Sequence, residues 1–244
     1  PIDEWIEGKL QATQLKQVAI EDLLGRSEVN IHQDHVAAEI NGKSILVTGA
    51  AGSIGSEIVR QLLRFKPRTV LLLDVAETGI HELILEVKRN FNQAGVTFEA
   101  LVADVCDQGY LNRVFKTHKV DVIYHAAAYK HVPLMENQPH QAVRVNFLAT
   151  YHLAKMAANQ GVEKFVFVST DKAVNPSNVM GASKRLAEMC LSMLQENNPK
   201  TAFVSVRFGN VLGSNGSVIP LFKKQVEAGG PITITHKEVT RYFM

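Results

Sequence analysis

The sequence has little of several features that mark special classes of protein. Two cysteines among 244 residues do not support a disulfide framework or a cysteine metal site. No run approaches the roughly 20 apolar residues that a membrane helix needs, and the first residues show no signal-peptide pattern. Neither charge sign dominates, since 26 Lys and Arg face 24 Asp and Glu without a basic cluster. We therefore expect no nucleic-acid partner and a cytoplasmic location for this chain.

The composition, 46% hydrophobic and 20% charged, is that of an ordinary globular domain. Cys190 shares helical spacing with Leu186 and Leu194, so we expect it to be a small core residue. The chain begins at Pro1 and stops at an apolar Met244, which favours a piece of a longer protein.

Apolar runs and helical patterns alternate from residue 44 onward, and this order predicts an α/β fold with a doubly wound parallel sheet. We expect strands at residues 44–48, 69–73, 98–102, 120–124, 165–168, 203–207 and 232–235. We expect helices at residues 54–65, 80–91, 111–115, 142–158, 177–194 and 219–228. We expect residues 1–43 to be a lead-in from an upstream region.

A glycine-rich stretch, GAAGSIG, joins the first predicted strand to the first helix. Gly49, Gly52 and Gly55 let the backbone turn tightly and approach a pyrophosphate. Ser53 and Ile54 open the helix, whose first N–H groups attract negative charge. The spacing is G-x-x-G-x-x-G rather than the commoner G-x-G-x-x-G. The strand before it and the helix after it are nevertheless the context of a dinucleotide site.

An acidic residue supports this site. Asp74 lies nineteen residues after Gly55, at the end of the second predicted strand, where a carboxylate can accept hydrogen bonds from ribose hydroxyls. A helix N-cap is the alternative role. No arginine follows Asp74 to neutralise a 2′-phosphate, so we expect NAD rather than NADP. The other residues expected around the cofactor follow the third and fourth strands: Asp104, Val105, Ala126, Ala127 and Ala128.

Three adjacent polar residues follow the strand at 165–168. Thr170, Asp171 and Lys172 place a hydroxyl, a carboxylate and an amine at the carboxyl end of a buried strand, where ligands of open α/β sheets bind. Thr and Asp are also ordinary turn residues, so a capped strand-to-helix loop is the alternative.

Five segments together give the chain a family resemblance: GAAGSIGSE at 49–57, HAAAYKHVPLME at 125–136, STDKAVNP at 169–176, MGASK at 180–184 and RFGNVLGSNGS at 207–217. They resemble the extended short-chain dehydrogenase/reductase superfamily, and within it the bacterial UDP-N-acetylglucosamine 4,6-dehydratases of surface-polysaccharide synthesis. The resemblance implies a Rossmann-like NAD-binding domain at residues 44–208 and a truncated substrate-binding lobe at 209–244. It also implies that the longer protein is anchored at the cytoplasmic face of the bacterial inner membrane.

The implied reaction is a redox-neutral dehydration of a UDP-N-acetylhexosamine to a 4-keto-6-deoxy sugar nucleotide. Hydride passes from sugar C4 to bound NAD and returns to C6 after water has left. By this resemblance Lys172 is the base that removes the C5 proton and Asp171 is the acid that protonates the leaving C6 hydroxyl. Thr170 is a hydrogen-bonding partner of the C4 oxygen. A nucleotide-sugar 4-epimerase and a non-catalytic nucleotide-binding module are the alternatives.

Most of the superfamily has Tyr-x-x-x-Lys where this chain has Met180 and Lys184. A thioether cannot take a proton, so the acceptor of the C4 hydroxyl proton stays open among Thr170, water and Lys184. We expect Lys184 to bind the nicotinamide ribose, and a solvated helix lysine is the alternative. By the same analogy Asn146 is a supporting hydrogen-bonding residue near Lys184.

The resemblance also implies contacts to the UDP-sugar from Lys130, His131, Asn210 and Ser217, although the loop at 210–217 has a plain crossover as its alternative role. The histidines lack the helical spacing of metal ligands, so we expect no metal site. The helices at 142–158 and 177–194 resemble the pair that forms dimer contacts in this superfamily, and they predict a homo-oligomer.

Overall fold

The structure, a computed structural model, describes residues 33–90, 95–211, 213, 218–234 and 243. The chain divides into two compact units. The larger unit is Ile31–Gly209, and the smaller one contains Asn210–Met244. No helix among the described residues is both long enough and apolar enough to cross a membrane.

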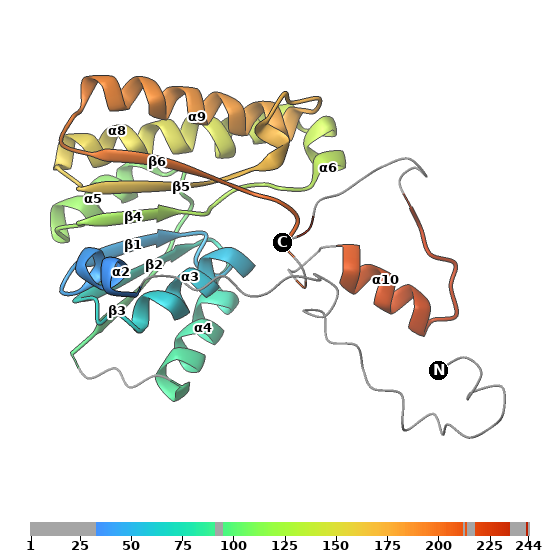
Figure 1. Cartoon of the computed structure of the whole chain (residues 1–244), viewed down its shortest axis with the longest axis horizontal. Helices are drawn as coiled ribbons and strands as arrows, with labels where there is room; N and C mark the ends of the chain where they lie inside the picture. The colour runs from blue at the N-terminus through green and yellow to red at the C-terminus, as the bar shows by residue number, and fades with distance from the viewer. Residues whose placement is uncertain (1–32, 91–94, 212, 214–217, 235–242, 244) are drawn as a thin grey trace. The chain divides into compact units, whose positions relative to one another are not determined.

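The larger unit is built on a six-stranded parallel sheet with the order β3-β2-β1-β4-β5-β6 (Figure 1). The strands are β1 Ser44–Thr48, β2 Thr69–Asp74, β3 Thr97–Val102, β4 Val122–His125, β5 Lys164–Thr170 and β6 Ala202–Phe208. From the middle of the sheet, β1, β2 and β3 follow one another toward one edge, and β4, β5 and β6 follow one another toward the other edge. The order therefore reverses between β1 and β4, the position where open α/β sheets bind ligands. The predicted fold class is confirmed.

The helices cover both faces of this sheet (Figure 1). In chain order they are α2 Gln33–Ile40, α3 Ser53–Leu63, α4 Glu77–Asn90, α5 Gln108–Thr117, α6 Val132–Asn137, α7 Pro139–Ala142, α8 Thr150–Gln160 and α9 Val179–Asn197. A π-helical stretch, η3 Val143–Ala149, joins α7 to α8, and a 3-10 turn, η4 Asp171–Ala173, follows β5 directly. The smaller unit contributes α10 Val218–Glu227.

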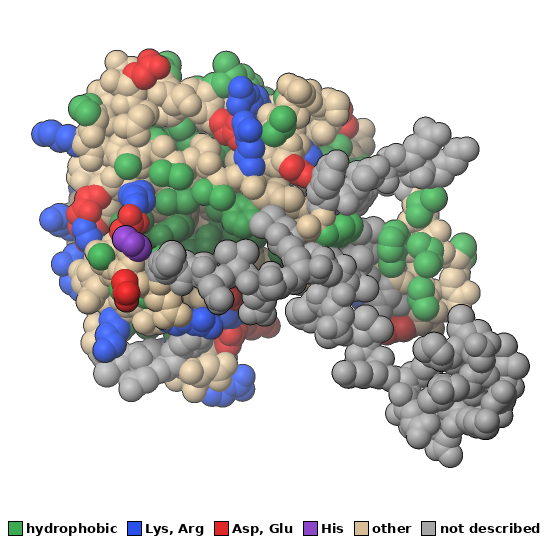
Figure 2. Space-filling model, in the orientation of Figure 1, with side chains coloured by type: hydrophobic (Ala, Val, Ile, Leu, Met, Phe, Trp, Pro, Cys, Tyr) green, Lys and Arg blue, Asp and Glu red, His purple; other side chains and the backbone are tan. Residues whose placement is uncertain are grey.

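Alternation along each strand produces two hydrophobic cores. In β1, Ile45 and Val47 pack with residues of α2, α3 and α4, whereas Leu46 packs with residues of α5, α8 and α9. Burial on both faces explains why the inner strands β1, β2, β4 and β5 are near-continuous apolar runs. The edge strand β6 is less covered, since Val204 and Val206 are 41% and 38% exposed. Figure 2 shows hydrophobic side chains gathered on the face toward the viewer, over the region where Figure 1 draws β4, β5 and β6.

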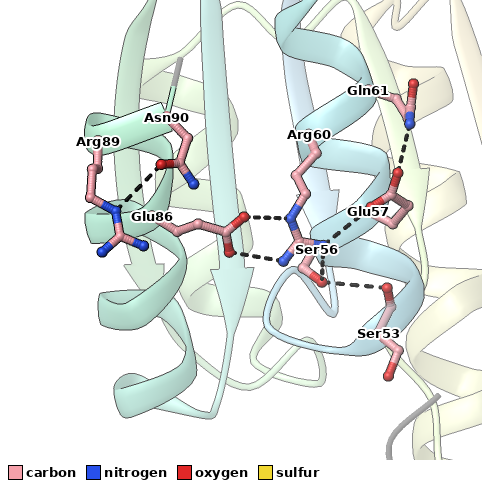
Figure 3. A network of polar contacts seen from close by, with 8 residues as sticks. All are labelled: Ser53, Ser56, Glu57, Arg60, Gln61, Glu86, Arg89 and Asn90. Atoms are coloured by element: carbon pink, nitrogen blue, oxygen red, sulfur yellow. Dashed lines mark hydrogen bonds and ion pairs between the residues drawn. The ribbon is translucent and has the colours of Figure 1, made fainter. Parts of the chain in front are cut away.

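A polar network holds α3, the helix that follows the glycine-rich stretch, against α4 (Figure 3). Arg60 donates to both carboxylate oxygens of Glu86, at 2.7 and 2.9 Å. It also donates to the hydroxyl of Ser56 at 3.3 Å, which in turn donates to the carbonyl of Ser53. The hydrogen bonds from Arg60 hold the pKa of Glu86 below its ordinary value. The network fixes the start of α3 relative to the second strand-helix unit.

Most predicted strands and helices lie within a few residues of the observed ones, but three predictions need correction. The predicted helix 142–158 begins earlier than expected, with α7 at Pro139. Its next part, η3, is π-helical and contains Asn146. The described part of the predicted lead-in is α2, whose Ile40 is buried in the core; residues 1–32 lie outside the described residues. The prediction of a strand at 232–235 is wrong over 232–234, since the N–H of Thr233 bonds the Gln225 side chain of α10 instead.

Cys190 is not a core residue. It is only half-buried, and its predicted neighbour Leu186 is 44% exposed. The buried face of α9 runs instead through Met180, Ser183, Lys184, Ala187, Glu188, Leu191 and Leu194. Because charged side chains occupy two of these buried positions, hydrophobic spacing alone assigns the wrong face.

Candidate active site

The glycine-rich stretch forms a cradle that leaves no room for side chains. Gly49 has a φ of 68°, and a Cβ on it would lie 2.5 Å from the backbone nitrogen of Ala127. A Cβ on Gly55 would lie 2.0 Å from the carbonyl oxygen of Gly49. Gly52 is the N-cap of α3 and makes no side-chain hydrogen bond to the first turn of the helix, which begins at Ser53 and Ile54. This arrangement fits a diphosphate at the helix N-terminus.

The two acidic residues expected around the cofactor, Asp74 and Asp104, accept hydrogen bonds from backbone N–H groups of neighbouring loops. Asp74 accepts from the N–H of Ala51 in the glycine-rich stretch and from the N–H of Ala76, both at 3.0 Å. It thus fixes both loops, and a carboxylate has further lone pairs for ribose hydroxyls. Asp104 accepts from the N–H of Cys106 at 2.9 Å and pairs with Arg144. Burial alone would raise the pKa of Asp104, but these bonds and the Arg144 charge lower it.

The remaining predicted cofactor residues, Val105 and the three alanines 126–128, differ in how far they are exposed. Val105 is 5% exposed and its side chain belongs to the hydrophobic core, so that side chain offers little surface to a ligand. Ala126, Ala127 and Ala128 are half-buried after β4, and the N–H of Ala126 bonds the carbonyl of Thr48 at the end of β1. The ends of β1 and β4 therefore lie together at the switch point of the sheet.

Thr170, Asp171 and Lys172 form one hydrogen-bonded group at the end of β5. The Thr170 hydroxyl donates to Oδ1 of Asp171 at 2.9 Å, and Nζ of Lys172 donates to the same oxygen at 3.2 Å. The backbone N–H of Lys172 donates to the Thr170 hydroxyl at 3.3 Å, which makes Thr170 the cap of η4. Asp171 and Lys172 side chains are each 36% exposed. The capped turn and the polar group are thus the same structure.

Helix α9 approaches this group closely. A Cβ on Gly181 would lie 2.2 Å from the carbonyl oxygen of Lys172, so only glycine permits the contact. Asn178 caps the helix by accepting from the N–H of Gly181 at 2.8 Å. Gly181 has no role in the sequence-based predictions, although it lies between the two singled-out residues Met180 and Lys184.

Lys184 is a buried cation and not a solvated helix lysine. It is 5% exposed, its Nζ donates to the carbonyl of Val168 at 2.8 Å, and it lies 4.3 Å from the ring centroid of Phe167. Burial lowers the pKa of Lys184 to about 7, against a smaller raising effect of Glu188. Met180 is 3% exposed and packs with Met135 and Ala142 in a separate apolar cluster.

A buried network absent from the sequence-based predictions joins the ends of β1 and β4 to η3. The Thr150 hydroxyl donates to the carbonyl of Asn146 at 2.8 Å, so it must accept from Nε2 of His125 at 2.9 Å. Nδ1 of His125 then accepts from the Thr48 hydroxyl at 2.6 Å. Burial, followed by the charge of Lys184, lowers the pKa of His125 to about 3 and keeps the ring neutral.

Asn146 extends the network toward α9. Its side-chain amide donates to the carbonyl of Tyr129 and to the hydroxyl of Ser183, and its oxygen accepts from the N–H of Tyr129. Asn146 is therefore held against Ser183, the residue before Lys184. The sequence signal of this network was an asparagine in the middle of the predicted helix 142–158, where Asn is unfavourable.

Glu188 forms a second buried centre that the sequence-based predictions missed. Its carboxylate accepts from Ser169 at 2.7 Å, from Arg207 at 2.7 and 2.9 Å, and from Arg185 at 3.1 Å. Burial alone would raise the pKa of Glu188, but these bonds lower it. It joins α9 to the ends of β5 and β6. The sequence signal for Glu188 was its spacing of four residues from Lys184, which places the two side chains on one face of a helix.

The predicted substrate contacts are divided between the two units of the chain. Lys130 and His131 are exposed after β4. Asn210 belongs to the smaller unit, and Ser217 lies outside the described residues. Within the described residues, no three His, Cys, Asp or Glu side chains are grouped to hold a metal ion.

Comparison with known proteins gives the chain its family. The model of a family described as "Polysaccharide biosynthesis protein" matches residues 45–244. The "Capsular polysaccharide biosynthesis protein CapD" of Staphylococcus aureus is 51% identical over 243 residues, which are 100% of this chain and 40% of that protein. A "UDP-N-acetylglucosamine 4,6-dehydratase (inverting)" of Campylobacter jejuni is 35% identical over 84% of this chain and 60% of its own length. The chain thus spans about half the length of these relatives.

Among solved structures, the UDP-glucose 4-epimerase of Thermus thermophilus in complex with NAD is similar, with a TM-score of 0.68 and 29% identity. The match covers 82% of this chain and 70% of that one. The family match, the sheet order and the glycine cradle agree. The chain belongs to the polysaccharide biosynthesis protein family, within the extended short-chain dehydrogenase/reductase superfamily.

Proposed function

We propose that the full-length protein is an NAD-dependent enzyme that dehydrates a UDP-N-acetylhexosamine, UDP-N-acetylglucosamine in the first instance, to a 4-keto-6-deoxy sugar nucleotide. The observation that carries the proposal is that Thr170 and Lys172 both donate hydrogen bonds to Oδ1 of Asp171, which brings an amine and a carboxylate together. Oxidation at C4 needs a group that takes the hydroxyl proton in both reactions, but an elimination needs in addition a base for C5 and an acid for the C6 hydroxyl, which an epimerisation at C4 does not. The 35% identical dehydratase of Campylobacter jejuni supports the same reaction.

The cofactor is assigned to residues 44–208 and part of the sugar site to residues 209–244. Gly49, Gly52 and Gly55 would hold the diphosphate, Asp74 the adenosine ribose, and Lys184 the nicotinamide ribose. NAD is favoured over NADP because the Asp74 carboxylate would repel a 2′-phosphate. Bound NAD would supply the hydride acceptor for sugar C4 and the hydride donor for C6.

The chain's own residues carry the proton transfers. Lys172 takes the proton from C5, which becomes acidic once C4 is a ketone. Asp171 protonates the C6 hydroxyl so that it leaves as water, and Thr170 bonds the C4 oxygen. Lys130, His131, Asn210 and Ser217 contact the UDP-sugar in this scheme. Acid–base groups in such positions typically accelerate a step by ~10²–10⁴-fold.

Mass spectrometry of UDP-N-acetylglucosamine incubated with the NAD-loaded full-length protein tests the proposal. We expect loss of one water. A product of unchanged mass with inverted C4 would establish the 4-epimerase, the alternative that the Thermus thermophilus structure favours. Tight binding of both ligands with no turnover would establish a non-catalytic nucleotide-binding module.

We also propose that the helical segments around 142–158 and 177–194 join two copies of the chain. Exposed apolar side chains on η3 and α9 support this: Val143, Leu148, Leu186, Met189 and Met193 are 39–56% exposed. Light scattering of the full-length protein should give a dimer mass, and Met189→Lys should give a monomer mass. A monomer mass for the unmodified protein would contradict the proposal.

A further inference from the structure

Helix α9 holds the strand β6 at both of its ends. At the amino end, the N–H of Phe203 donates to Oε1 of Gln195 at 2.7 Å. At the carboxyl end, Arg207 donates to both carboxylate oxygens of Glu188, at 2.9 and 2.7 Å. Gln195 lies seven residues after Glu188, two turns further along the same face of the helix. Two separate side chains of one helix therefore fix the two ends of the strand.

The Glu188 contact lies at the end of the sheet where ligands of open α/β folds bind. Arg207 is the last but one residue of β6, and the smaller unit of the chain begins at Asn210. Arg207 pairs across the strands with Ser169, whose hydroxyl donates to the same carboxylate at 2.7 Å. Ser169 directly precedes Thr170. One carboxylate thus ties together two strand ends, of which one leads into the Thr170 group and the other into the segment with the predicted UDP contacts.

The form of the contact favours a positioning role over stabilisation alone. Glu188 is 5% exposed, and a buried ion pair is often no more stabilising than apolar side chains of the same size. What the pair adds is direction, because two parallel hydrogen bonds between Arg207 and a carboxylate fix the angle between the two groups. Among the described strands, β6 has a neighbour on its β5 side only. Its carboxyl end therefore depends on α9 for the rest of its support.

We infer that Glu188, acting through Arg207, is a positioning residue for the UDP part of the sugar nucleotide. It fixes how the chain leaves β6, and the segment that follows carries the predicted UDP contacts Asn210 and Ser217. The inference rests on the proposed function and deepens it, since it concerns how the nucleotide is held. A segment whose start is already fixed costs less to order when the ligand binds. Without the bidentate contact, that cost is met on binding and the affinity for UDP falls.

Calorimetric titration of UDP into the full-length NAD-loaded protein tests the inference. Arg207→Met should weaken UDP binding by about tenfold or more and leave the affinity for NAD within about twofold. Gln195→Met is the matched control, because it releases the same strand at the opposite end. Arg185→Met is a second control, since it removes a donor from the same carboxylate without touching β6. Both controls should bind UDP within about twofold of the unmodified protein. Equal weakening by Arg207→Met and Gln195→Met, or none by Arg207→Met, would overturn the inference.

A double-mutant cycle tests whether Glu188 acts through Arg207. Glu188→Gln should weaken UDP binding by itself, but in a protein that already carries Arg207→Met it should add less than about twofold. A full second loss in the double variant would show that Glu188 acts by another route. Arg207→Lys keeps the charge and loses the fork of two parallel hydrogen bonds, so it should bind UDP nearly as weakly as Arg207→Met. Unmodified affinity in Arg207→Lys would rule out a directional contact.

The inference and the proposed reaction fail in different ways. If the unmodified protein binds UDP, Arg207→Met does not, and UDP-N-acetylglucosamine loses no water, the positioning role stands and only the dehydration is wrong. If the unmodified protein dehydrates the sugar nucleotide and all the variants bind UDP equally, the dehydration stands and the positioning role is wrong. A full-length protein that binds NAD but no UDP would overturn both.

Discussion

Replacing Lys184 by methionine removes a charge from the protein interior and should make the nucleotide-free protein more stable. Burial lowers the pKa of Lys184 from 10.5 to about 7. At pH 7 this difference corresponds to roughly 4 kcal/mol of destabilisation by the buried lysine, at about 1.4 kcal/mol per unit. The variant loses the bond to the Val168 carbonyl, which costs about 1–3 kcal/mol. We therefore expect Lys184→Met to gain about 1–3 kcal/mol in the free energy of unfolding.

The pH dependence of this gain identifies its cause. Above pH 7 the unfolded lysine keeps its proton to about pH 10.5, whereas the native lysine has lost it. The unfolded state thus binds more protons, and the stability of the unmodified protein rises with pH. The difference between variant and unmodified protein should shrink by about 2 kcal/mol from pH 7 to pH 9.

Urea denaturation followed by circular dichroism at both pH values measures these differences. Lys116→Met, at an exposed position on α5, is the control and should change stability little at either pH. A variant less stable than the unmodified protein at pH 7, or a difference that does not change with pH, would refute a buried, destabilising ammonium at position 184.

Two further substitutions test the parts that surround the group at Thr170. Gly55→Ala should weaken NAD binding at least tenfold in calorimetry, because the added Cβ would lie 2.0 Å from the carbonyl oxygen of Gly49. Gly109→Ala is the control and should bind NAD normally, because its added Cβ would meet only a side-chain oxygen of Asp107 at 3.3 Å. Glu188→Gln should lower the free energy of unfolding by about 2–3 kcal/mol, since it leaves two partly exposed arginines without their carboxylate. Because the pKa of Glu188 is lowered in the native protein, this loss should shrink as the pH falls below about 4, and a constant loss would contradict the charge pairing.

The order of the fold was predictable because its signals are local. Each inner strand of the sheet is a short apolar run ended by polar residues, and buried parallel strands require such runs. The glycine-rich stretch was predictable for the same reason, since Gly49 and Gly55 are required by contacts within a few residues of themselves or across one strand pair.

The buried polar residues of the site were harder to predict. Lys184 and Glu188 occupy core positions of α9, so a search for apolar spacing placed the buried face on Cys190 and Leu186 instead. The partners of His125, Thr48 and Thr150, are 77 and 25 residues away, and no local pattern indicates such pairs. Resemblance to a family supplied the roles of Thr170, Asp171 and Lys172, and these roles stay predictions.

The central claim is that one hydride moves from C4 to C6 of the same sugar while the Asp171 and Lys172 pair removes water. The most direct measurement uses UDP-N-acetylglucosamine carrying deuterium at C4, incubated with the full-length NAD-loaded protein, and locates the label in the product by NMR. The account predicts deuterium in the C6 methyl group and solvent hydrogen at C5. Deuterium that stays at C4, in a sugar that keeps its C6 hydroxyl, would contradict it.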